Sequence, residues 1–253
     1  MNHPRTLAVL LDGPPADFAA EVRLAADLGF THVDVVALEE RPAADLEALA
    51  DAGVVVRCAA VGRGLADVCT PEAVGRMRRQ IADAARLGAT HAYVVSGTDG
   101  SPDGLARFAE ACGLLADYAA GRMVRLCVEP IPGRALADAA TTLEWLRRTA
   151  HPNLALLLDV GHCLLSGEDP AAVARAAGAW LGYVHLDDND GMGDLHWPLL
   201  TGRLTPTHLT DLAAALGELR FSGGLSLELK AAASERAAAF RAGKEIVTSL
   251  LNF

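Results

Sequence analysis

Short apolar segments alternate with longer segments of helical period from one end of the chain to the other. The apolar segments are nearly continuous, as is typical of strands covered on both faces of a sheet. Several helical segments lie between an N-capping residue and a terminal glycine, as Thr70 and Gly88 do around the third. The predicted strands are residues 7–11, 31–38, 54–61, 89–95, 125–129, 154–159, 183–186 and 225–229. The predicted helices are residues 17–28, 44–52, 71–87, 103–120, 142–149, 170–180, 206–219 and 234–251.

This alternation predicts an α/β fold. Strands that alternate strictly with helices favour an all-parallel sheet, and eight such units fit a closed (β/α)8 barrel, the TIM barrel. No linker or low-complexity segment interrupts the pattern, so we expect one domain over residues 1–253. A doubly wound open sheet is the alternative fold, in which the ends of neighbouring strands diverge.

Four of the predicted strands end on residues that can bind a divalent metal ion: Glu129, Asp159, His185 and Glu228. The intervals between them are 30, 26 and 43 residues (159 − 129, 185 − 159 and 228 − 185), and a strand, a helix and their loops take about 30 residues. Because the carboxyl ends of barrel strands meet on one face, we expect these side chains to converge. The pattern predicts one metal site of mixed oxygen and nitrogen ligands, suited to Mn²⁺, Mg²⁺, Co²⁺ or Zn²⁺.

The charges of these residues support that prediction. Three carboxylates on one rim would repel each other unless a cation compensates them. For each carboxylate the alternative is a structural ion pair with an arginine. For His185 the alternative is a structural position in the core, with its hydrogen bonds satisfied. A metal-bound imidazole usually donates its other N–H to an acceptor, and we expect Asp187 or Asp188 to accept from His185.

A second group of polar residues follows the same strands. His162 lies three residues after Asp159, and Asp194 and His196 lie in a long loop, residues 187–203, after the seventh strand. Long loops without a pattern of their own are usually functional or disordered. We expect His162, Asp194 and His196 to bind substrate, and a second metal site formed by the same three residues is the alternative.

Two further side chains are candidates for the pocket. Arg134 follows Glu129 in the segment Glu-Pro-Ile-Pro-Gly-Arg, where it would bind a hydroxyl or phosphate of the substrate. Glu39 follows the second strand and would line the pocket. Surface positions are the alternative for both. Basic residues on the expected rim are few, which favours an unphosphorylated substrate.

Composition and charge limit the partners. The formal net charge is −10, with 22 basic and 32 acidic residues, which argues against nucleic acid because lysine and arginine supply most non-specific affinity for phosphates. The five cysteines form no CxxC pair, so we expect reduced thiols in a cytoplasmic protein. No segment approaches the ~20 apolar residues of a membrane span, and no signal peptide is expected. The oligomeric state stays open, and a homodimer is the commonest soluble assembly.

Several short motifs give the chain a family resemblance. They are Val128-Glu129-Pro130, Leu158-Asp159-Val160-Gly161-His162, Val184-His185-Leu186-Asp187-Asp188-Asn189, Gly193-Asp194-Leu195-His196-Trp197-Pro198 and Leu227-Glu228. Taken together they resemble the xylose-isomerase-like superfamily of sugar-phosphate isomerases, epimerases and endonuclease-IV-type enzymes. The resemblance covers essentially the whole chain and implies a TIM barrel. It also implies the shared four-residue metal site, whose residues correspond to Glu129, Asp159, His185 and Glu228.

The resemblance assigns roles to the other residues as well. It implies that the two glutamates are the acid/base pair of the epimerases and that His162 contacts substrate. His162 also matches a zinc ligand of the endonucleases, and Asp194 and His196 match their third-zinc pair. The endonucleases carry further histidines after the early strands, whereas residues 54–63 and 92–97 contain none at the expected strand ends. This departure argues against a trinuclear nuclease site.

The expected function is a divalent-metal-dependent isomerase or epimerase. Its substrate would be a small carbonyl compound with neighbouring hydroxyls, such as a keto sugar, a sugar phosphate or a polyol ketone. Glu129 and Glu228 would transfer the proton through an enediolate stabilised by the metal. Three alternatives stay open: a dehydratase of the inosose type, an endonuclease-IV-like phosphodiesterase, and a barrel that binds a ligand without catalysis.

Overall fold

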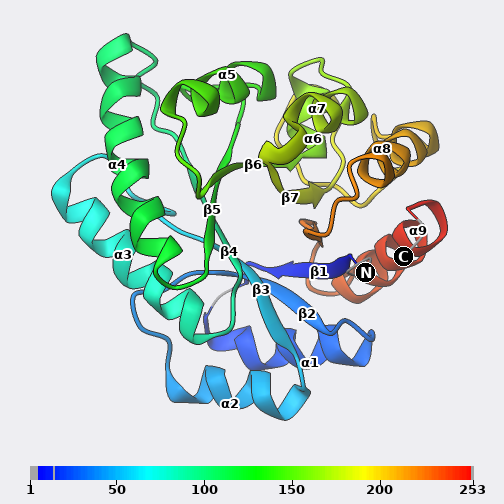
Figure 1. Cartoon of the computed structure of the whole chain (residues 1–253). Coiled ribbons are helices and arrows are strands. Elements are labelled where there is room, and N and C mark those ends of the chain that lie inside the picture. The colour runs from blue at the N-terminus through cyan, green and yellow to red at the C-terminus, as the bar shows by residue number, and fades with distance from the viewer. Residues whose placement is uncertain (1–4, 14, 252–253) are drawn as a thin grey trace.

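The strands close into a barrel. In the computed structural model, which describes residues 5–13 and 15–251, eight parallel strands pair in chain order and the last pairs with the first (Figure 1). The strands are β1 (Thr6–Leu11), β2 (His32–Val36), β3 (Val55–Ala60), β4 (His91–Val95), β5 (Arg125–Glu129), β6 (Leu154–Asp159), β7 (Leu181–Leu186) and β8 (Gly224–Leu227). The pairing of β1 with β8 confirms the TIM barrel and excludes the open sheet.

Helices surround the strands, and α9 lies beside β1 in Figure 1. The helices are α1 (Phe18–Asp27), α2 (Ala43–Ala52), α3 (Pro71–Arg86), α4 (Pro102–Ala120), α5 (Ala139–Thr149), α6 (Val160–Leu165), α7 (Pro170–Ala177), α8 (Pro206–Glu218) and α9 (Arg236–Leu250), with short 3-10 turns at Pro15–Asp17 and Gly178–Trp180. The guanidinium of Arg5 donates to the carbonyl of Leu251 (3.3 Å), so the two ends of the described chain lie close together. Within residues 5–13 and 15–251 no helix is both long and apolar enough to span a bilayer.

The predicted helix boundaries depend on local hydrogen bonds that the structure shows. The hydroxyl of Thr70 accepts from the N–H of Ala73 (3.1 Å) and begins α3. Asp169 begins α7 in the same way, accepting from the N–H of Ala172 (2.8 Å). After α3, Gly88 has a φ of +88°, a left-handed conformation that favours glycine.

Apart from shifts of one to three residues in element ends, the second half of the chain differs from the prediction in two places. A short helix, α6, begins directly after Asp159, where the sequence pattern predicted a loop. The carboxylate of Asp159 accepts from the N–H of His162 (2.7 Å) and caps this helix. The helix predicted over residues 170–180 is divided, because Gly178 ends α7 with a φ of +54° and a 3-10 turn follows.

Side chains that alternate between the two faces of each strand bring the site residues into one layer. Buried side chains from five strands, β3 to β7, fill the interior of the barrel: Cys58, Ala60, Tyr93, Cys127, Ala155, Leu157 and Tyr183. A residue two positions further along a strand points to the same face. Glu129, Asp159 and His185 therefore form the next layer above Cys127, Leu157 and Tyr183, at the carboxyl end of the barrel. Glu228 lies one residue beyond β8, but its N–H still donates to the carbonyl of Leu186 (3.1 Å) and extends the ladder.

Candidate functional site

The structure brings together the four residues that end the strands. One donor atom each from Glu129, Asp159, His185 and Glu228, which we call the inner set, lies within 4.8 Å of the other three. The Nδ1 atom of His185 is 2.6 Å from Glu228 Oε2, 3.4 Å from Glu129 Oε1 and 3.9 Å from Asp159 Oδ2. The register pairs Asp159 directly with His185, so neighbouring strands deliver both side chains at one height.

The inner set fits a divalent cation. Glu129 Oε1, Asp159 Oδ2, His185 Nδ1 and Glu228 Oε2 are all buried and make no hydrogen bond within the described structure. Buried polar atoms without partners are rare because each costs free energy. Three carboxylate oxygens and one imidazole nitrogen are a ligand set that Mn²⁺, Mg²⁺, Co²⁺ and Zn²⁺ accept.

The buried inner-set side chains strongly perturb one another. Burial raises the pKa of Glu129, and it raises the pKa of Asp159 to about 7, with a contribution from the charge of Asp187. For Glu228, the charge and contact of His185 outweigh the effect of burial and lower its pKa to about 2. Burial alone would lower the pKa of His185, but the charge of Glu228 and the contacts with both glutamates raise it well above its usual value. A dication here would lower the carboxylate pKa values further.

The two carboxylate oxygens of Asp159 have different roles. Its Oδ1 atom caps α6, and its Oδ2 atom is free to face the inner set. The next turn is fixed by Asp187, whose Oδ1 accepts from the N–H of Gly161 (2.8 Å). A Cβ atom at Gly161 would lie 2.5 Å from this carboxylate, so only glycine allows the contact.

His162, Asp194 and His196 also converge, and we call them the outer set. Asp194 Oδ1 lies 3.2 Å from His162 Nε2 and 2.9 Å from His196 Nε2, so one carboxylate oxygen bridges the two rings. The Nδ1 atom of His196 lies 2.9 Å from Asp187. His162 Nδ1 faces inward, 3.5 Å from Asp159 and 3.9 Å from Glu129, so the two sets are adjacent.

Contacts within the outer set raise the pKa values of its two histidines and lower the pKa of its aspartate. Burial alone lowers the pKa of His162, but the charge of Asp159 and the hydrogen bond with Asp194 raise it to about 10. Burial likewise opposes charging of His196, but contacts with Asp187 and Asp194 raise its pKa to about 11. The same contacts hold the pKa of Asp194 well below its usual range.

The loop over residues 187–203 is anchored by Asp188. Its carboxylate accepts from the N–H groups of Asn189, Gly202 and Leu204 at 2.7–2.8 Å. The backbone of Asp188 also pairs with that of Trp197 in an antiparallel bridge. His196 takes a left-handed backbone conformation (φ +47°), which is uncommon outside glycine and is typical of functional positions. The loop thus presents Asp194 and His196 to the site.

The other carboxylates expected near the inner set have different partners in the structure. Asp187 and Asp188 do not accept from His185, because Asp187 binds Gly161 and His196 while Asp188 binds the loop backbone. That prediction is wrong. For Glu39 the structure favours the surface alternative, because this side chain forms ion pairs with two arginines of α3 (Arg76 and Arg79).

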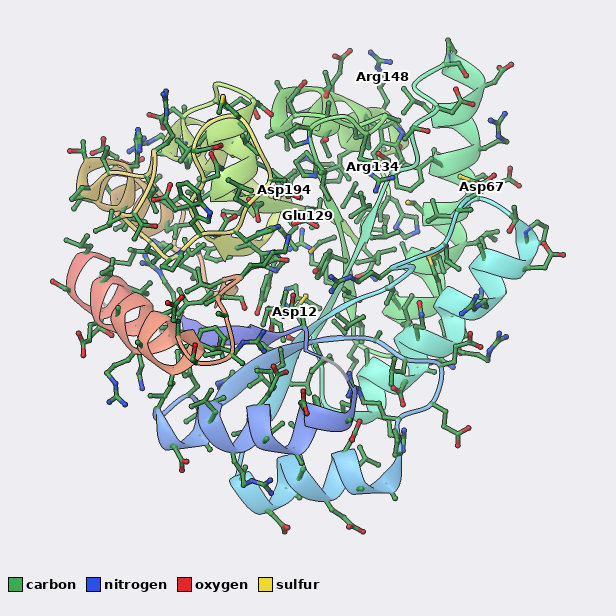
Figure 2. The ribbon with its side chains drawn as sticks, turned by 180° about the vertical axis from the view of Figure 1, so that it is seen from behind. Asp12, Asp67, Glu129, Arg134, Arg148 and Asp194 are labelled. Carbon is green, nitrogen blue, oxygen red and sulfur yellow. The ribbon has the colours of Figure 1, made fainter. Side chains whose placement is uncertain are left out.

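Arg134 is not brought into contact with either set. Glu129 and Asp194 lie near the centre of the view in Figure 2, and Arg134 lies to one side of them. Its side chain is exposed, and it makes no ion pair within the described residues. For Arg134 to bind substrate, the loop between β5 and α5 would have to move toward the two sets, or the substrate would have to extend to Arg134.

Sequence reasoning missed Asp34, a carboxylate buried in the middle of β2. It is fully buried, and its Oδ1 atom accepts from the hydroxyl of Tyr183 (2.8 Å) and the N–H of Cys58 (2.9 Å). Its Oδ2 atom lies 3.9 Å from His185 Nε2, below the inner set. Burial raises the pKa of Asp34 to about 6. The signal in the sequence was an acid among the three valines (Val33, Val35 and Val36) of a predicted buried strand, because aspartate is rarely fully buried unless it is paired.

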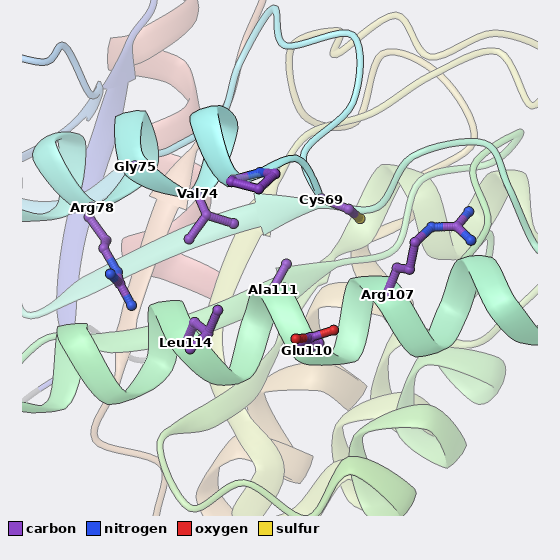
Figure 3. Close-up of a pocket in the computed structure, with 9 residues that line it drawn as sticks. Cys69, Val74, Gly75, Arg78, Arg107, Glu110, Ala111 and Leu114 are labelled. Carbon is purple, nitrogen blue, oxygen red and sulfur yellow. The ribbon is translucent and has the colours of Figure 1, made fainter.

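A separate pocket of about 380 Å³ lies on the outside of the barrel. It is formed between α3 and α4, with Cys69, Val74, Arg78, Arg107 and Leu114 among its lining residues (Figure 3). None of the residues that line it belongs to the inner or the outer set. The convergent chemistry of the molecule therefore lies at the barrel mouth and not in this pocket.

A family comparison agrees with this arrangement. The family model described as "Xylose isomerase-like TIM barrel" matches residues 22–250. The chain belongs to this family. The match covers nine-tenths of the sequence and confirms the resemblance carried by the strand-end motifs. No curated protein sequence gives a significant match to the chain.

Solved structures similar to this chain include several sugar epimerases. D-allulose 3-epimerase from Methylomonas sp. is 20% identical, with a TM-score of 0.81 over 99% of this chain and 100% of the other. D-psicose 3-epimerase from Clostridium cellulolyticum H10 is 13% identical, with a TM-score of 0.79 and coverages of 97% and 99%. The E. coli 3-keto-D-glucoside 4-epimerase is 16% identical, with a TM-score of 0.78 and coverages of 99% and 100%. At these identities the likeness establishes the shared fold.

Proposed function

We propose that this protein is a metal-dependent isomerase or epimerase of a small keto sugar or related polyol ketone. The observation that carries the proposal is the inner set, whose four buried donor atoms converge without hydrogen-bond partners. Glu129, Asp159, His185 and Glu228 would hold one divalent ion. Bound there, the ion would act as a Lewis acid toward a carbonyl and a neighbouring hydroxyl and so acidify the adjoining C–H.

The two glutamates would transfer the proton. Glu129 comes from β5 and Glu228 follows β8, with β6 and β7 between them, so the carboxylates approach the centre from different directions. One would remove the proton from substrate carbon and the other would return it, on the opposite face in an epimerase or at the adjacent carbon in an isomerase. Asp159 and His185, which lie between them on the barrel, would hold the ion.

The outer set would bind the hydroxyl groups of the substrate. His162, Asp194 and His196 present charged donors and acceptors directly beside Glu129 and Asp159. The set contains no arginine or lysine, so its chemistry suits hydroxyls better than a phosphate group. The similar structures are, by their names, epimerases of allulose, psicose and a 3-keto-glucoside, which supports a sugar as the substrate class.

Hydrogen exchange at substrate carbon tests the proposal. The purified chain, supplied with Mn²⁺, Mg²⁺, Co²⁺ or Zn²⁺, would be incubated with a panel of free ketohexoses, ketopentoses and keto-glycosides in D₂O. The expected result is incorporation of deuterium together with a new sugar, detected by NMR. The Glu129→Gln variant is expected to lose the exchange, by about 10²-fold or more, while Asp117→Asn, at an exposed carboxylate of α4, is expected to keep it.

The same experiment separates the alternatives. An unsaturated product that absorbs in the ultraviolet would mean that the substrate loses a hydroxyl, and the enzyme would be a dehydratase. Exchange that persists unchanged in Glu129→Gln would remove Glu129 from the proton transfer. Absence of exchange with every sugar and every metal ion would contradict the proposal.

A further inference from the structure

One carboxylate below the site is only half explained by the packing around it. Asp34 is fully buried in the barrel interior. Its Oδ1 atom accepts from the Tyr183 hydroxyl and the Cys58 N–H, which satisfies that oxygen. Its Oδ2 atom has no hydrogen-bond partner within the described structure. An asparagine would accept the same two hydrogen bonds through its amide oxygen, so a purely structural role does not require the second oxygen or the charge.

The Oδ2 atom of Asp34 faces the Nε2 side of the His185 ring, away from the inner set. The Nδ1 atom of His185 points to the three carboxylates of the inner set, and its Nε2 atom points to Asp34 Oδ2 at 3.9 Å. Within residues 5–13 and 15–251, Asp34 is the one carboxylate within 4 Å of this nitrogen. Tyr93 and Tyr183 meet the imidazole nearly edge-on, with interplanar angles of 86° and 89°, and fix the plane of the ring.

We infer that Asp34 is a positioning residue that accepts the Nε2 proton of His185 and thereby makes Nδ1 the nitrogen that binds the metal ion. This inference rests on the metal site of the proposed function. A neutral imidazole carries one N–H, so an acceptor at Nε2 leaves the lone pair at Nδ1. The observed 3.9 Å exceeds a hydrogen bond, and a movement of about 1 Å brings the two atoms into range.

The physical consequence is an effect on metal affinity. An acceptor behind a ligating histidine fixes its tautomer and orientation and raises its basicity. Replacing the acceptor oxygen by an amide N–H would place a donor opposite Nε2, which favours the tautomer with its proton on Nδ1. That tautomer cannot bind the ion without first losing the proton.

The test is the affinity of the whole chain for Zn²⁺, measured by competition with a fluorescent chelator. Asp34→Asn preserves the shape of the side chain and its contacts with Tyr183 and Cys58. We expect it to weaken Zn²⁺ binding by about 10- to 100-fold, without lowering the melting temperature of the metal-free protein. The matched control is Tyr183→Phe, which removes a partner of the other oxygen and is expected to weaken Zn²⁺ binding much less.

A measurement on the wild-type chain makes the test independent of the folding of the variants. In the Zn²⁺-loaded protein, ¹⁵N chemical shifts of His185 should show a proton on Nε2 and none on Nδ1. A proton on Nδ1, an unchanged affinity in Asp34→Asn, or an equal loss in Tyr183→Phe would each overturn the inference.

Failure of the inference is distinguishable from failure of the proposed function. Wild-type protein that binds Zn²⁺ but turns over no sugar would overturn the proposed function and leave the role of Asp34 standing. Wild-type protein that binds no Zn²⁺ would overturn both.

Discussion

The inner and outer sets use the same residue types but differ in how their charges can be neutralised. The inner set has three carboxylates and one imidazole, so even a protonated His185 leaves two negative charges in a buried place. The outer set has one carboxylate between two imidazoles, and the side chain of Asp194 is 41% exposed. Protons and solvent can neutralise the outer set. The inner set keeps an excess of negative charge unless its carboxylates take up protons or a cation, and this excess makes it the candidate metal centre of the two.

The largest expected difference between the sets is in metal affinity. Asp159→Asn removes an inner ligand charge, and we expect it to weaken Zn²⁺ or Mn²⁺ binding by more than about 100-fold, beyond the 10- to 100-fold typical of supporting residues. Asp194→Asn, the same substitution in the outer set, should leave the affinity nearly unchanged. Isothermal titration of both variants measures this. Equal losses would show that the outer set also holds metal.

Turnover, unlike metal affinity, should depend on the outer set. Because Asp194 contacts both His162 and His196, its substitution by asparagine should lower kcat/KM by about tenfold, the lower end for hydrogen bonds to a charged group that solvent reaches. We expect the change mainly in KM, measured by steady-state kinetics on the sugar that shows exchange. A normal KM in Asp194→Asn would remove the outer set from substrate binding.

Metal should also stabilise the fold through the inner set alone. At a concentration 100 times its Kd, an ion that binds only the folded chain adds about 2.7 kcal/mol to the free energy of unfolding. For a chain of this length that raises Tm by about 5–10 °C. Wild type and Asp194→Asn should show this shift in thermal melts, and Asp159→Asn should not. A shift retained in Asp159→Asn would place the ion elsewhere.

The last expected effect is a pH dependence of stability to which the outer set contributes two histidines. The pKa of His162 is raised to about 10 and that of His196 to about 11, above the ordinary 6.5. Their contribution is complete below pH 6.5 and is lost as the pH rises through 10–11, because the folded chain binds more protons than the unfolded chain in that range. Metal-free protein should therefore lose stability between pH 7 and 9, by up to about 1.4 kcal/mol per pH unit for each of these two histidines. His185, whose pKa is also raised, adds to the loss.

Urea unfolding at several pH values measures this slope. Asp194→Asn should flatten it, because the shared acceptor of both histidines is lost. Asp117→Asn is the matched control, since it removes an exposed carboxylate beside His151 and should leave the slope unchanged. A wild-type stability that is level across this range would contradict the charged state assigned to the outer set.

The barrel and the inner set could be predicted because both depend on local patterns. Strand β5 and strand β6 were predicted with their observed bounds, since apolar runs of this kind end where a polar residue meets the rim. Parallel closure then brings strand ends to one face whatever the loops do. Glu228 was predicted to face the interior although β8 stops one residue earlier. Its position follows from the alternation of side chains and not from the assigned boundary.

The rest depends on contacts between segments far apart in the chain. Asp34 faces His185 across the barrel interior, 151 residues away in sequence (185 − 34), and no local pattern reports such a contact. Helix α6 was missed because it is six residues long and its cap is Asp159, which the sequence pattern had assigned to metal alone. The acceptor for His185 was sought next to it in sequence, at Asp187 and Asp188, whereas those carboxylates anchor the turn after β6 and the loop.

Metal content per chain tests the central claim most directly. Wild type, Asp159→Asn and Asp194→Asn would be purified without chelators, reconstituted with Mn²⁺ or Zn²⁺, desalted, and measured by elemental analysis. The account predicts about one ion per chain in wild type and in Asp194→Asn, and none in Asp159→Asn. Wild type that holds no ion after reconstitution, or an ion that is lost with Asp194 and kept without Asp159, would contradict it.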